Sequence, residues 1–206
     1  MVKRALIFDF GGVLMKTADY RPRHRWDERL NLPHGSVERV VHNTTSWVQA
    51  QTGRVTPSAY WRDVGGQLGL SADETQQLAV DFYSGDALDE ALIALIRGYQ
   101  GAGHTVALLS NDSLELLPKL ARLGIDGLFD PLIVSAQVGL MKPDPAIYAH
   151  VLGVLQRPPG HTIFVDDRAE NVAAAARLGI HTIHYHAGMD LAAALSPLLV
   201  MGAAEG

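Results

Sequence analysis

The stretch Arg4-Ala5-Leu6-Ile7-Phe8-Asp9-Phe10-Gly11-Gly12-Val13-Leu14 decides the fold of this chain. Its apolar run from Ala5 to Phe8 has no polar break, which is typical of a strand buried on both faces inside a parallel sheet. Asp9 follows directly, and a charge at the tip of such a strand is unfavourable unless it is paired, hydrogen-bonded or bound to a metal. Ligands bind at these strand ends, and glycines let the backbone approach a ligand closely. The stretch therefore places Asp9 in a candidate site, the alternative being an Asp that only caps the following segment.

The chain from Asp86 onward alternates apolar strands with helical segments, many of them bounded by turn and cap residues. Strands are expected at 3–8, 104–110, 132–135, 161–166 and 181–185, and helices at 87–100, 114–123, 145–155, 170–178 and 191–199. Strands that alternate with helices predict an α/β fold with a parallel, Rossmann-like sheet covered on both faces.

Residues 16 to 85 differ in character, because they show helical spacing and no strand pattern. Thr56-Pro57 resembles a cap followed by a first-turn proline, and Ser71 with Glu74 has the spacing of a capping box. We expect three to five short helices here, packed as a small all-helical unit inserted after the first strand. The predicted division is a core of residues 1–15 and 86–206 and a helical insertion of residues 16–85.

Composition narrows the classes of function. The 206 residues carry a net charge of -5 and no block of Lys and Arg, so neither nucleic acid nor a membrane surface is an expected partner. The cluster Arg21, Arg23, His24 and Arg25 is interpreted as a solvated helix start. The absence of cysteine excludes thiolate chemistry and zinc-thiolate sites. No apolar run is long enough to span a bilayer, so we expect a cytoplasmic protein. We expect it to be a monomer or a homodimer.

Polar residues follow three of the predicted strands at their carboxyl ends. They are Asp9, then Ser110-Asn111, then Asp166-Asp167, and the loop 139–145 adds Lys142. Because the strand ends of a parallel sheet share one edge, these groups are expected to converge. Carboxylate oxygens suit Mg²⁺, while a lysine, a hydroxyl and backbone N–H groups suit phosphate. The pattern predicts a site for a metal and a phosphate.

These stretches together resemble the four motifs of the haloacid dehalogenase-like hydrolase superfamily. The matching residues, in order, are Phe8-Asp9-Phe10-Gly11-Gly12-Val13-Leu14, Leu109-Ser110-Asn111, Gly139-Leu140-Met141-Lys142-Pro143-Asp144-Pro145 and Phe164-Val165-Asp166-Asp167. The resemblance spans essentially the whole chain, and it identifies the helical insertion as the family's cap domain. Within the superfamily, the Asp-x-Gly start and Gly53-Arg54-Val55-Thr56 resemble bacterial sugar-phosphate phosphatases.

The resemblance implies a role for each matching residue. Asp9 would be the nucleophile that forms an aspartyl-phosphate. Mg²⁺ would be bound by Asp9, Asp167 and the Gly11 carbonyl, with Asp166 behind them or bound through water. Lys142 would bind phosphate and steady Asp9. The phosphoryl oxygens would be held by Ser110, Asn111, Phe10 and Gly11. The implied function is a Mg²⁺-dependent phosphohydrolase of a small phosphorylated metabolite.

Gly11 departs from the family's usual pattern, in which a second Asp protonates the leaving group and activates water. General acid–base catalysis is typically worth about 10²–10⁴ in rate. Three explanations stand open: a substrate with a good leaving group such as an acyl phosphate or sugar 1-phosphate, a substitute such as His24 or Asp19, or a slow or vestigial enzyme.

The same departure keeps a second class open, because the superfamily's 2-haloacid dehalogenases also lack that Asp and work without a metal. Their fourth motif lacks an acidic pair, whereas Asp166 and Asp167 beside Asp9 would repel strongly without a cation. We therefore favour the phosphatase over the metal-independent 2-haloacid dehalogenase. A non-catalytic phosphate-binding protein is the third interpretation.

Overall fold

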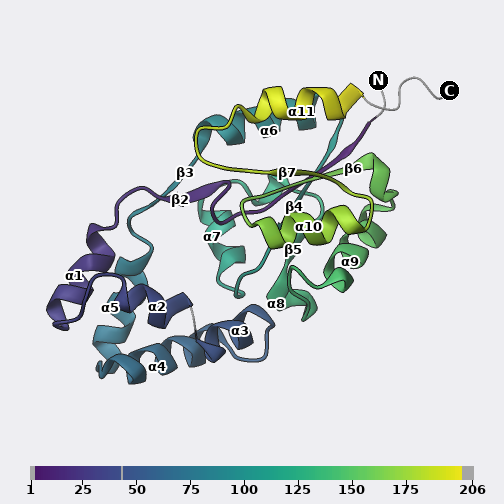
Figure 1. Ribbon diagram of the computed structural model, residues 1–206. Helices are drawn as coiled ribbons and strands as arrows, with labels where there is room; N and C mark the ends of the chain where they lie inside the picture. Colours follow the sequence, from purple (N-terminus) through teal and green to yellow (C-terminus); the bar gives the residue numbers. More distant parts are fainter. Residues whose placement is uncertain (1–2, 43, 201–206) are drawn as a thin grey trace.

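A parallel five-stranded sheet forms the larger part of the computed structural model, which describes residues 3–42 and 44–200. The strand order is β5-β4-β1-β6-β7, with the strand that carries Asp9 at its tip in the centre (Figure 1). Their bounds are β1 (Ala5–Phe8), β4 (Thr105–Ser110), β5 (Leu132–Val134), β6 (Thr162–Asp166) and β7 (His181–His184). The predicted α/β fold is confirmed.

Helices cover both faces of this sheet, because successive side chains of each buried strand point to opposite sides. Leu6 and Phe8 of β1 pack with one set of helices and Ile7 packs with the other. The first set is α6 (Glu90–Gly101), α7 (Leu116–Arg122) and α11 (Leu191–Val200), and the second is α9 (Pro145–Leu155) and α10 (Ala169–Arg177). Shorter elements are α8 (Ser135–Val138), η1 (Asp126–Leu128) and η2 (Pro159–His161).

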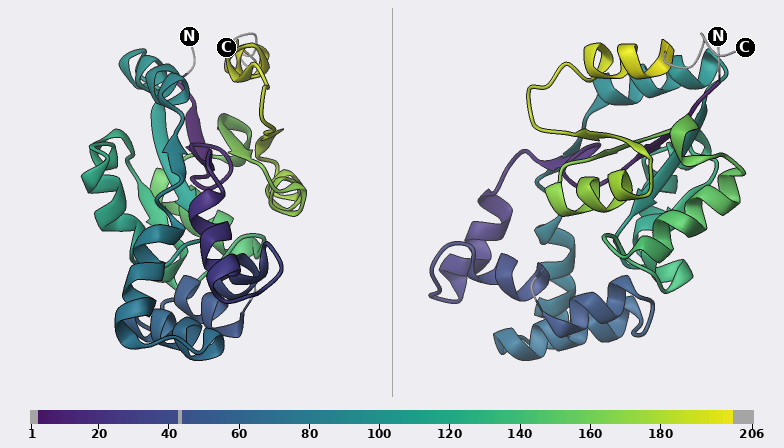
Figure 2. Two further views of the ribbon diagram at one scale, coloured as in Figure 1. Left: turned by 90° about the vertical axis from the view of Figure 1, so that its left-hand side faces the viewer. Right: turned by 45° about the vertical axis from the view of Figure 1, so that its right-hand side comes forward.

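In the described part of the chain, the first five helices after β1 in sequence form what we call the helical unit. They are α1 (Arg21–Arg29), α2 (Ser36–His42), α3 (Thr45–Gln51), α4 (Pro57–Leu68) and α5 (Ala72–Phe82). The unit has a hydrophobic core of its own around Trp26, Tyr60 and Phe82. Figure 2 shows it at one end of the molecule, on the side toward which β1 runs. The helical insertion after the first strand is confirmed, but the expectation that it contains no strand is wrong for residues 16 and 17, which lie in a short strand.

Two short strands join the helical unit to the sheet. β2 (Met15–Thr17) and β3 (Asp86–Leu88) pair antiparallel, with Lys16 opposite Ala87. The helix predicted from residue 87 is therefore wrong at its start, since α6 begins at Glu90. The Asp89 carboxylate accepts a 3.0 Å hydrogen bond from the Leu92 N–H and caps the helix there. Three-residue strands are too short to show an alternating pattern.

Arg23 lies buried at this junction, and the interpretation of its cluster as solvated is wrong for this residue. Its guanidinium forms ion pairs with Asp86 at 2.9 Å and with Glu38 at 2.8 Å. It also donates to the Phe82 carbonyl. Because the Arg23 charge is paired on several sides, it is stable out of water.

Among the described residues, no helix has the length and apolar character needed to cross a bilayer.

Candidate active site

The carboxyl edge of the sheet opens into a cavity of about 930 Å³, which the helical unit faces. Asp9 follows β1, Ser110 ends β4 and Asp166 ends β6, so three neighbouring strands deliver polar groups to one edge. The cavity is lined by most of the predicted site residues: Asp9, Phe10, Gly11, Ser110, Asn111, Lys142 and Asp167. Asp166 is fully buried behind them. The structure thus brings all of the predicted residues together.

Lys142 connects the three strand ends. Its Nζ lies 2.8 Å from Asp9 Oδ1 and 2.7 Å from Asp166 Oδ2, and donates to the Leu109 carbonyl at 2.8 Å. Burial alone would lower the pKa of Lys142, but the two carboxylates outweigh it and raise that pKa. The ammonium is therefore a permanent positive charge at the base of the cavity.

Asp166 holds other groups in place. Besides Lys142, its carboxylate accepts from the Arg168 backbone N–H at 2.8 Å and from Asn171 Nδ2 at 3.0 and 3.1 Å. These donors occupy both oxygens, which agrees with a position behind any metal rather than on it. The same bonds tie the start of α10 to β6 and fix Lys142 against Asp9.

Three carboxylates crowd this site. Asp9, Asp166 and Asp167 can each offer an oxygen such that all three lie within 4.8 Å of one another. Burial and the charge of Asp166, partly offset by Lys142, raise the pKa of Asp9 to about 6. Burial also raises the pKa of Asp167, again with a contribution from Asp166. Within residues 3–42 and 44–200, Lys142 is the one basic side chain ion-paired to Asp9 and Asp166. This donor set therefore fits a hard divalent cation, which would relieve the repulsion.

Gly11 and Gly12 differ in the space around them. Gly12 has φ +80°, and a Cβ there would lie 2.1 Å from an Asp167 carboxylate oxygen, so only glycine lets that carboxylate approach the Asp9 turn. The turn is closed by hydrogen bonds from the Gly12 N–H to the Met15 carbonyl and from the Met15 N–H to the Phe10 carbonyl. A Cβ on Gly11 meets no atom within 4 Å, so the space above it is open.

Asn111 has a role that the sequence did not reveal. Its Nδ2 donates to the Lys142 carbonyl at 2.7 Å, and its Oδ1 accepts from the Lys142 N–H at 2.8 Å. This two-way bond clamps the lysine loop beside β4. The Asn111 carbonyl in turn accepts from Gln51 Nε2 at 2.9 Å, which links the helical unit to the site. Buried Ser110 lies beside Asn111 at the end of β4.

The helical unit supplies the opposite wall of the cavity. This wall is polar and aromatic, and it includes Tyr20, Arg23, Glu38, His42, Trp47, Gln51 and Tyr83. His42 packs against Trp47 with ring centroids 5.5 Å apart and edge-on against Phe82 at 5.2 Å. Burial lowers the pKa of His42 to about 4, so it is neutral at pH 7. No sequence motif distinguished these wall residues.

Known proteins resemble this chain over most of its length. It is 30% identical to a sesquiterpene phosphatase of Aspergillus oryzae over 186 residues, covering 88% of this chain and 89% of the relative. It is 26% identical to a D-ribitol-5-phosphate phosphatase of Bacteroides thetaiotaomicron, covering 97% and 99%. Other relatives are longer: this chain spans 18% of a mouse acyl-CoA dehydrogenase family member and 34% of a drimenol cyclase of Aspergillus calidoustus.

Solved structures show the same fold. A haloacid dehalogenase family enzyme of Bacteroides thetaiotaomicron, in complex with magnesium and inorganic phosphate, superposes with a TM-score of 0.80 at 21% identity and covers 94% of this chain and 99% of that one. An L-2-haloacid dehalogenase of Xanthobacter autotrophicus superposes with a TM-score of 0.67 at 21% identity, covering 94% and 82%. The family model for haloacid dehalogenase-like hydrolases matches residues 3–179. The chain therefore belongs to the haloacid dehalogenase-like hydrolases and is an enzyme of that family.

Proposed function

We propose that this enzyme is a Mg²⁺-dependent phosphohydrolase that acts on a small phosphorylated metabolite through an aspartyl-phosphate on Asp9. One observation carries the proposal: three carboxylates can offer oxygens within 4.8 Å of one another, and in the part of the chain that the structure describes Lys142 is the one ion-pair partner of Asp9 and Asp166. That excess of negative charge would repel an anionic substrate unless a divalent cation were present. Two relatives bearing phosphatase names, one from a fungus and one from a bacterium, support the same chemistry.

The residues divide the work as follows. Asp167, Asp9 and the Gly11 carbonyl would hold the cation, which when bound supplies charge neutralisation of the phosphoryl oxygens. Lys142 would bind a phosphoryl oxygen and hold the Asp9 carboxylate toward phosphorus. The Ser110 hydroxyl and the backbone N–H groups of Phe10, Gly11 and Asn111 would cradle the remaining oxygens. Positioning and charge neutralisation are most of what phosphoryl transfer requires.

The helical unit would serve as the cap that selects the substrate and excludes water, with the core formed by residues 1–15 and 86–206 and the cap by residues 16–85. Its wall residues line the same cavity as Asp9. Several contacts reach across to the core, among them those from Gln51 to the Asn111 carbonyl and from Trp61 Nε1 to Glu115 Oε2 at 3.1 Å. These contacts support a closed arrangement in which the cavity lies between the two parts.

The test is phosphate release from p-nitrophenyl phosphate and a panel of phosphorylated metabolites, with Mg²⁺ or with EDTA. We expect release by the wild type only with Mg²⁺, and none above background by Asp9→Asn, because the amide oxygen is a poor nucleophile. The exposed Asp190→Asn is the matched control and should retain full activity, since Asp190 caps α11 and is not among the residues that line the cavity.

Release that persists in EDTA would contradict the metal dependence. No release from any compound would overturn the phosphatase, and halide release from 2-haloacids would then be measured, since Gly11 and the likeness to a dehalogenase fold keep that chemistry as the second candidate.

A further inference from the structure

The loop after β1 has glycine, Gly11, at the position from which a general acid would reach the cavity most directly. Gly11 lines the cavity, and the space in which its side chain would stand is open. When a phosphate ester of an ordinary alcohol is cleaved, the departing oxygen carries a developing negative charge and needs a proton. Neither substitute suggested by the sequence fits. Asp19 is ion-paired to Arg21, His24 stacks on His34, and neither belongs to the described lining of the cavity.

Most other titratable groups that line the cavity are engaged elsewhere. Glu38 and Asp86 are ion-paired to Arg23, and Lys16 is paired to Asp89. The pKa of His42 is too low for it to carry a proton at pH 7. His184 Nε2 is hydrogen-bonded to the Asp167 carbonyl at 2.9 Å, on the opposite side of β1 from Ser110. Asp112 remains as a carboxyl group for which no ion pair is found within residues 3–42 and 44–200.

Asp112 is held firmly two residues beyond Ser110. Its N–H donates to Ser135 Oγ at 3.0 Å, and Ser135 Oγ donates back to its carbonyl at 3.2 Å. Ser135 is fully buried, so this pair of bonds fixes the backbone of Asp112. One carboxyl oxygen, Oδ1, accepts from the Ser113 N–H at 2.7 Å. That bond leaves Oδ2 as the oxygen that can carry a proton.

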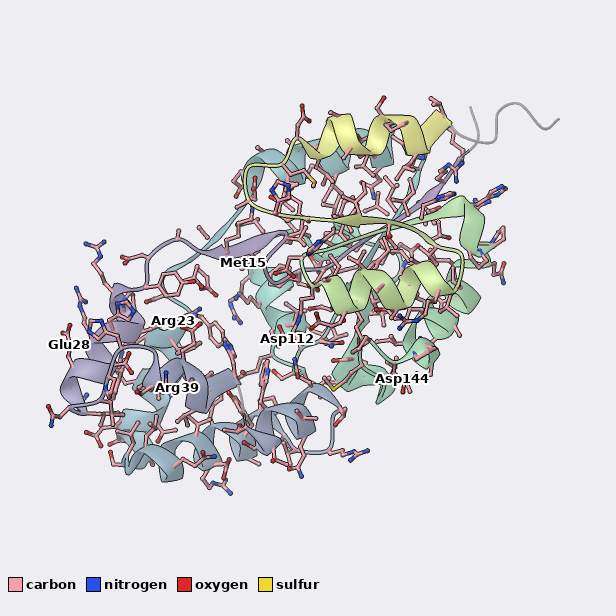
Figure 3. The ribbon with its side chains drawn as sticks, viewed as in Figure 1. Met15, Arg23, Glu28, Arg39, Asp112 and Asp144 are labelled. Atoms are coloured by element: carbon pink, nitrogen blue, oxygen red, sulfur yellow. The ribbon has the colours of Figure 1, made fainter. Side chains whose placement is uncertain are left out.

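The position of Asp112 is at the junction of two hollows. It lines the cavity that contains Asp9, and it also lines a second hollow of about 610 Å³ between α5 and α7. Figure 3 shows the labelled Asp112 in the space between the sheet and the helical unit. Lys142 and Ser110 line the same cavity, so a group that leaves a phosphate held by them departs into a space that Asp112 borders.

The groups around Asp112 favour its protonated form near neutral pH. Burial raises the pKa of Asp112 to about 7, against the lowering effects of the Ser113 N–H and Lys119. The charges of Glu115 and Asp9 contribute to that rise. From the helical unit, the neutral phenols of Tyr83 and Tyr60 interact with it electrostatically. A carboxyl group with a pKa close to the working pH can both give and take a proton.

We propose that Asp112 is the general acid and base of this enzyme, an inference that rests on the proposed phosphohydrolase function. In the first step an Asp9 oxygen bonds to phosphorus as the bond from phosphorus to the ester oxygen breaks. The electron pair of that bond goes to the departing oxygen, which takes the proton from Asp112 and leaves as an alcohol.

In the second step water attacks phosphorus from the side that the alcohol has left. Asp112, now a carboxylate, takes a proton from this water while the bond between phosphorus and Asp9 breaks. Phosphate is released, and Asp9 and Asp112 return to their starting states. One group can serve both steps because the alcohol and the water occupy the same place opposite Asp9.

The experiment uses Asp112→Asn with two substrates, p-nitrophenyl phosphate and benzyl phosphate. Nitrophenolate leaves without a proton, whereas benzyl alkoxide needs one. We expect kcat/KM for benzyl phosphate to fall about 10²–10⁴-fold and that for p-nitrophenyl phosphate to change less than about threefold. With the latter substrate the variant should release a burst of about one equivalent of nitrophenol and then turn over slowly, because the second step has lost its base.

Two further measurements complete the test. Adding Gly11→Asp to Asp112→Asn should restore kcat/KM for benzyl phosphate, since the space above Gly11 admits a side chain.

In the wild type, kcat/KM for benzyl phosphate should fall at high pH as Asp112 loses its proton. Glu115→Gln should move this high-pH limb of the profile to lower pH, because it removes a charge that raises the pKa of Asp112. The second measurement needs no variant at Asp112, so a folding defect there would not prevent the test.

The outcomes separate this inference from the proposed function. An equal loss on both substrates, or no loss on benzyl phosphate, overturns the role of Asp112 while leaving the phosphohydrolase intact. An unshifted pH limb in Glu115→Gln does the same. Failure of the wild type to release phosphate from these esters and from every compound of the metabolite panel overturns the proposed function and this inference with it.

Discussion

At the scale of single residues, the charge on Asp9 is the most sensitive quantity in the site. Asp9 shares the Lys142 ammonium with Asp166 and is only 7% exposed. Asp166 is saturated with donors, whereas Asp9 has Lys142 as its ion-pair partner. Without a metal, ionised Asp9 is therefore the less well compensated of the two, which is why burial raises its pKa.

This raised pKa predicts how stability depends on pH. Asp9 titrates at about 6 in the folded protein against 3.8 as its ordinary value. A group whose folded pKa is raised stabilises the fold fully only at pH values below its unfolded pKa, and loses that stabilisation as pH rises through its folded pKa. In EDTA, the wild type should therefore lose stability relative to Asp9→Asn between about pH 4 and pH 6, by up to about 1 kcal/mol per pH unit.

The measurement is urea unfolding of the two proteins in EDTA across this range. Taking the difference removes the contributions of other groups, such as His42, whose lowered pKa acts in the opposite direction. Asp190→Asn should follow the wild type at every pH. Saturating Mg²⁺ should abolish the relative loss, because the cation favours the ionised form. A difference between wild type and Asp9→Asn that stays constant in EDTA would refute the raised pKa.

The sequence predicted which residues meet in the site, but it did not predict all of the contacts that hold them there. Asp9 and Lys142 could be predicted to meet because a parallel sheet places its strand ends along one edge. The clamp by Asn111 could not, because its partner is the backbone of Lys142, and backbone groups are the same at every residue. The acid at position 112 carried no signal either, since its burial depends on elements distant in sequence.

At the scale of elements, the loop between α3 and α4 packs closely against the core. Gly53 in this loop has φ +69°, and a Cβ there would lie 2.3 Å from the Ala136 carbonyl oxygen in α8. Only glycine permits both the conformation and the approach. This contact, with the bond from Gln51 to Asn111, sets the distance between the two walls of the cavity.

Gly53→Ala should therefore push the helical unit away from the core. We expect a loss of about 1–3 kcal/mol in the free energy of unfolding, together with a fall in kcat/KM for p-nitrophenyl phosphate. Gly66→Ala is the matched control, because Gly66 lies inside α4 with no atom within 4 Å of a Cβ. It should gain about 0.5–1 kcal/mol and keep its activity. Equal stability and activity in the two variants would show that the approach at Gly53 is unimportant.

Elements fixed by local interactions could be predicted from the sequence, whereas elements fixed by distant partners could not. The starts of α4 and α5 were visible because Thr56 and Ser71 cap them through their own side chains, a local interaction. The pairing of β2 with β3 was not visible, because its partners are about seventy residues apart and each strand has three residues. The burial of Arg23 follows from that pairing, since Asp86 begins β3.

At the scale of the whole molecule, the residues that would bind the cation and the tryptophans that report unfolding lie in different parts. The residues that would bind the cation, Asp9 and Asp167, belong to the sheet edge. All three tryptophans, Trp26, Trp47 and Trp61, belong to the helical unit. Tryptophan fluorescence therefore reports unfolding of the helical unit, whereas far-ultraviolet circular dichroism reports the whole chain.

If phosphate and Mg²⁺ bind between the two parts, they should stabilise both. At one hundred times their dissociation constant, ligands add about 2.7 kcal/mol, which corresponds to a rise in Tm of about 5–10 °C for a chain of this size. We expect this rise with Mg²⁺ and inorganic phosphate by both probes, because the helical unit closes the cavity in which they bind. Asp167→Asn should abolish it by both probes, and Asp190→Asn should retain it. A rise seen by circular dichroism alone would mean that the helical unit unfolds independently of the occupied site, and that it does not act as a cap on the bound state.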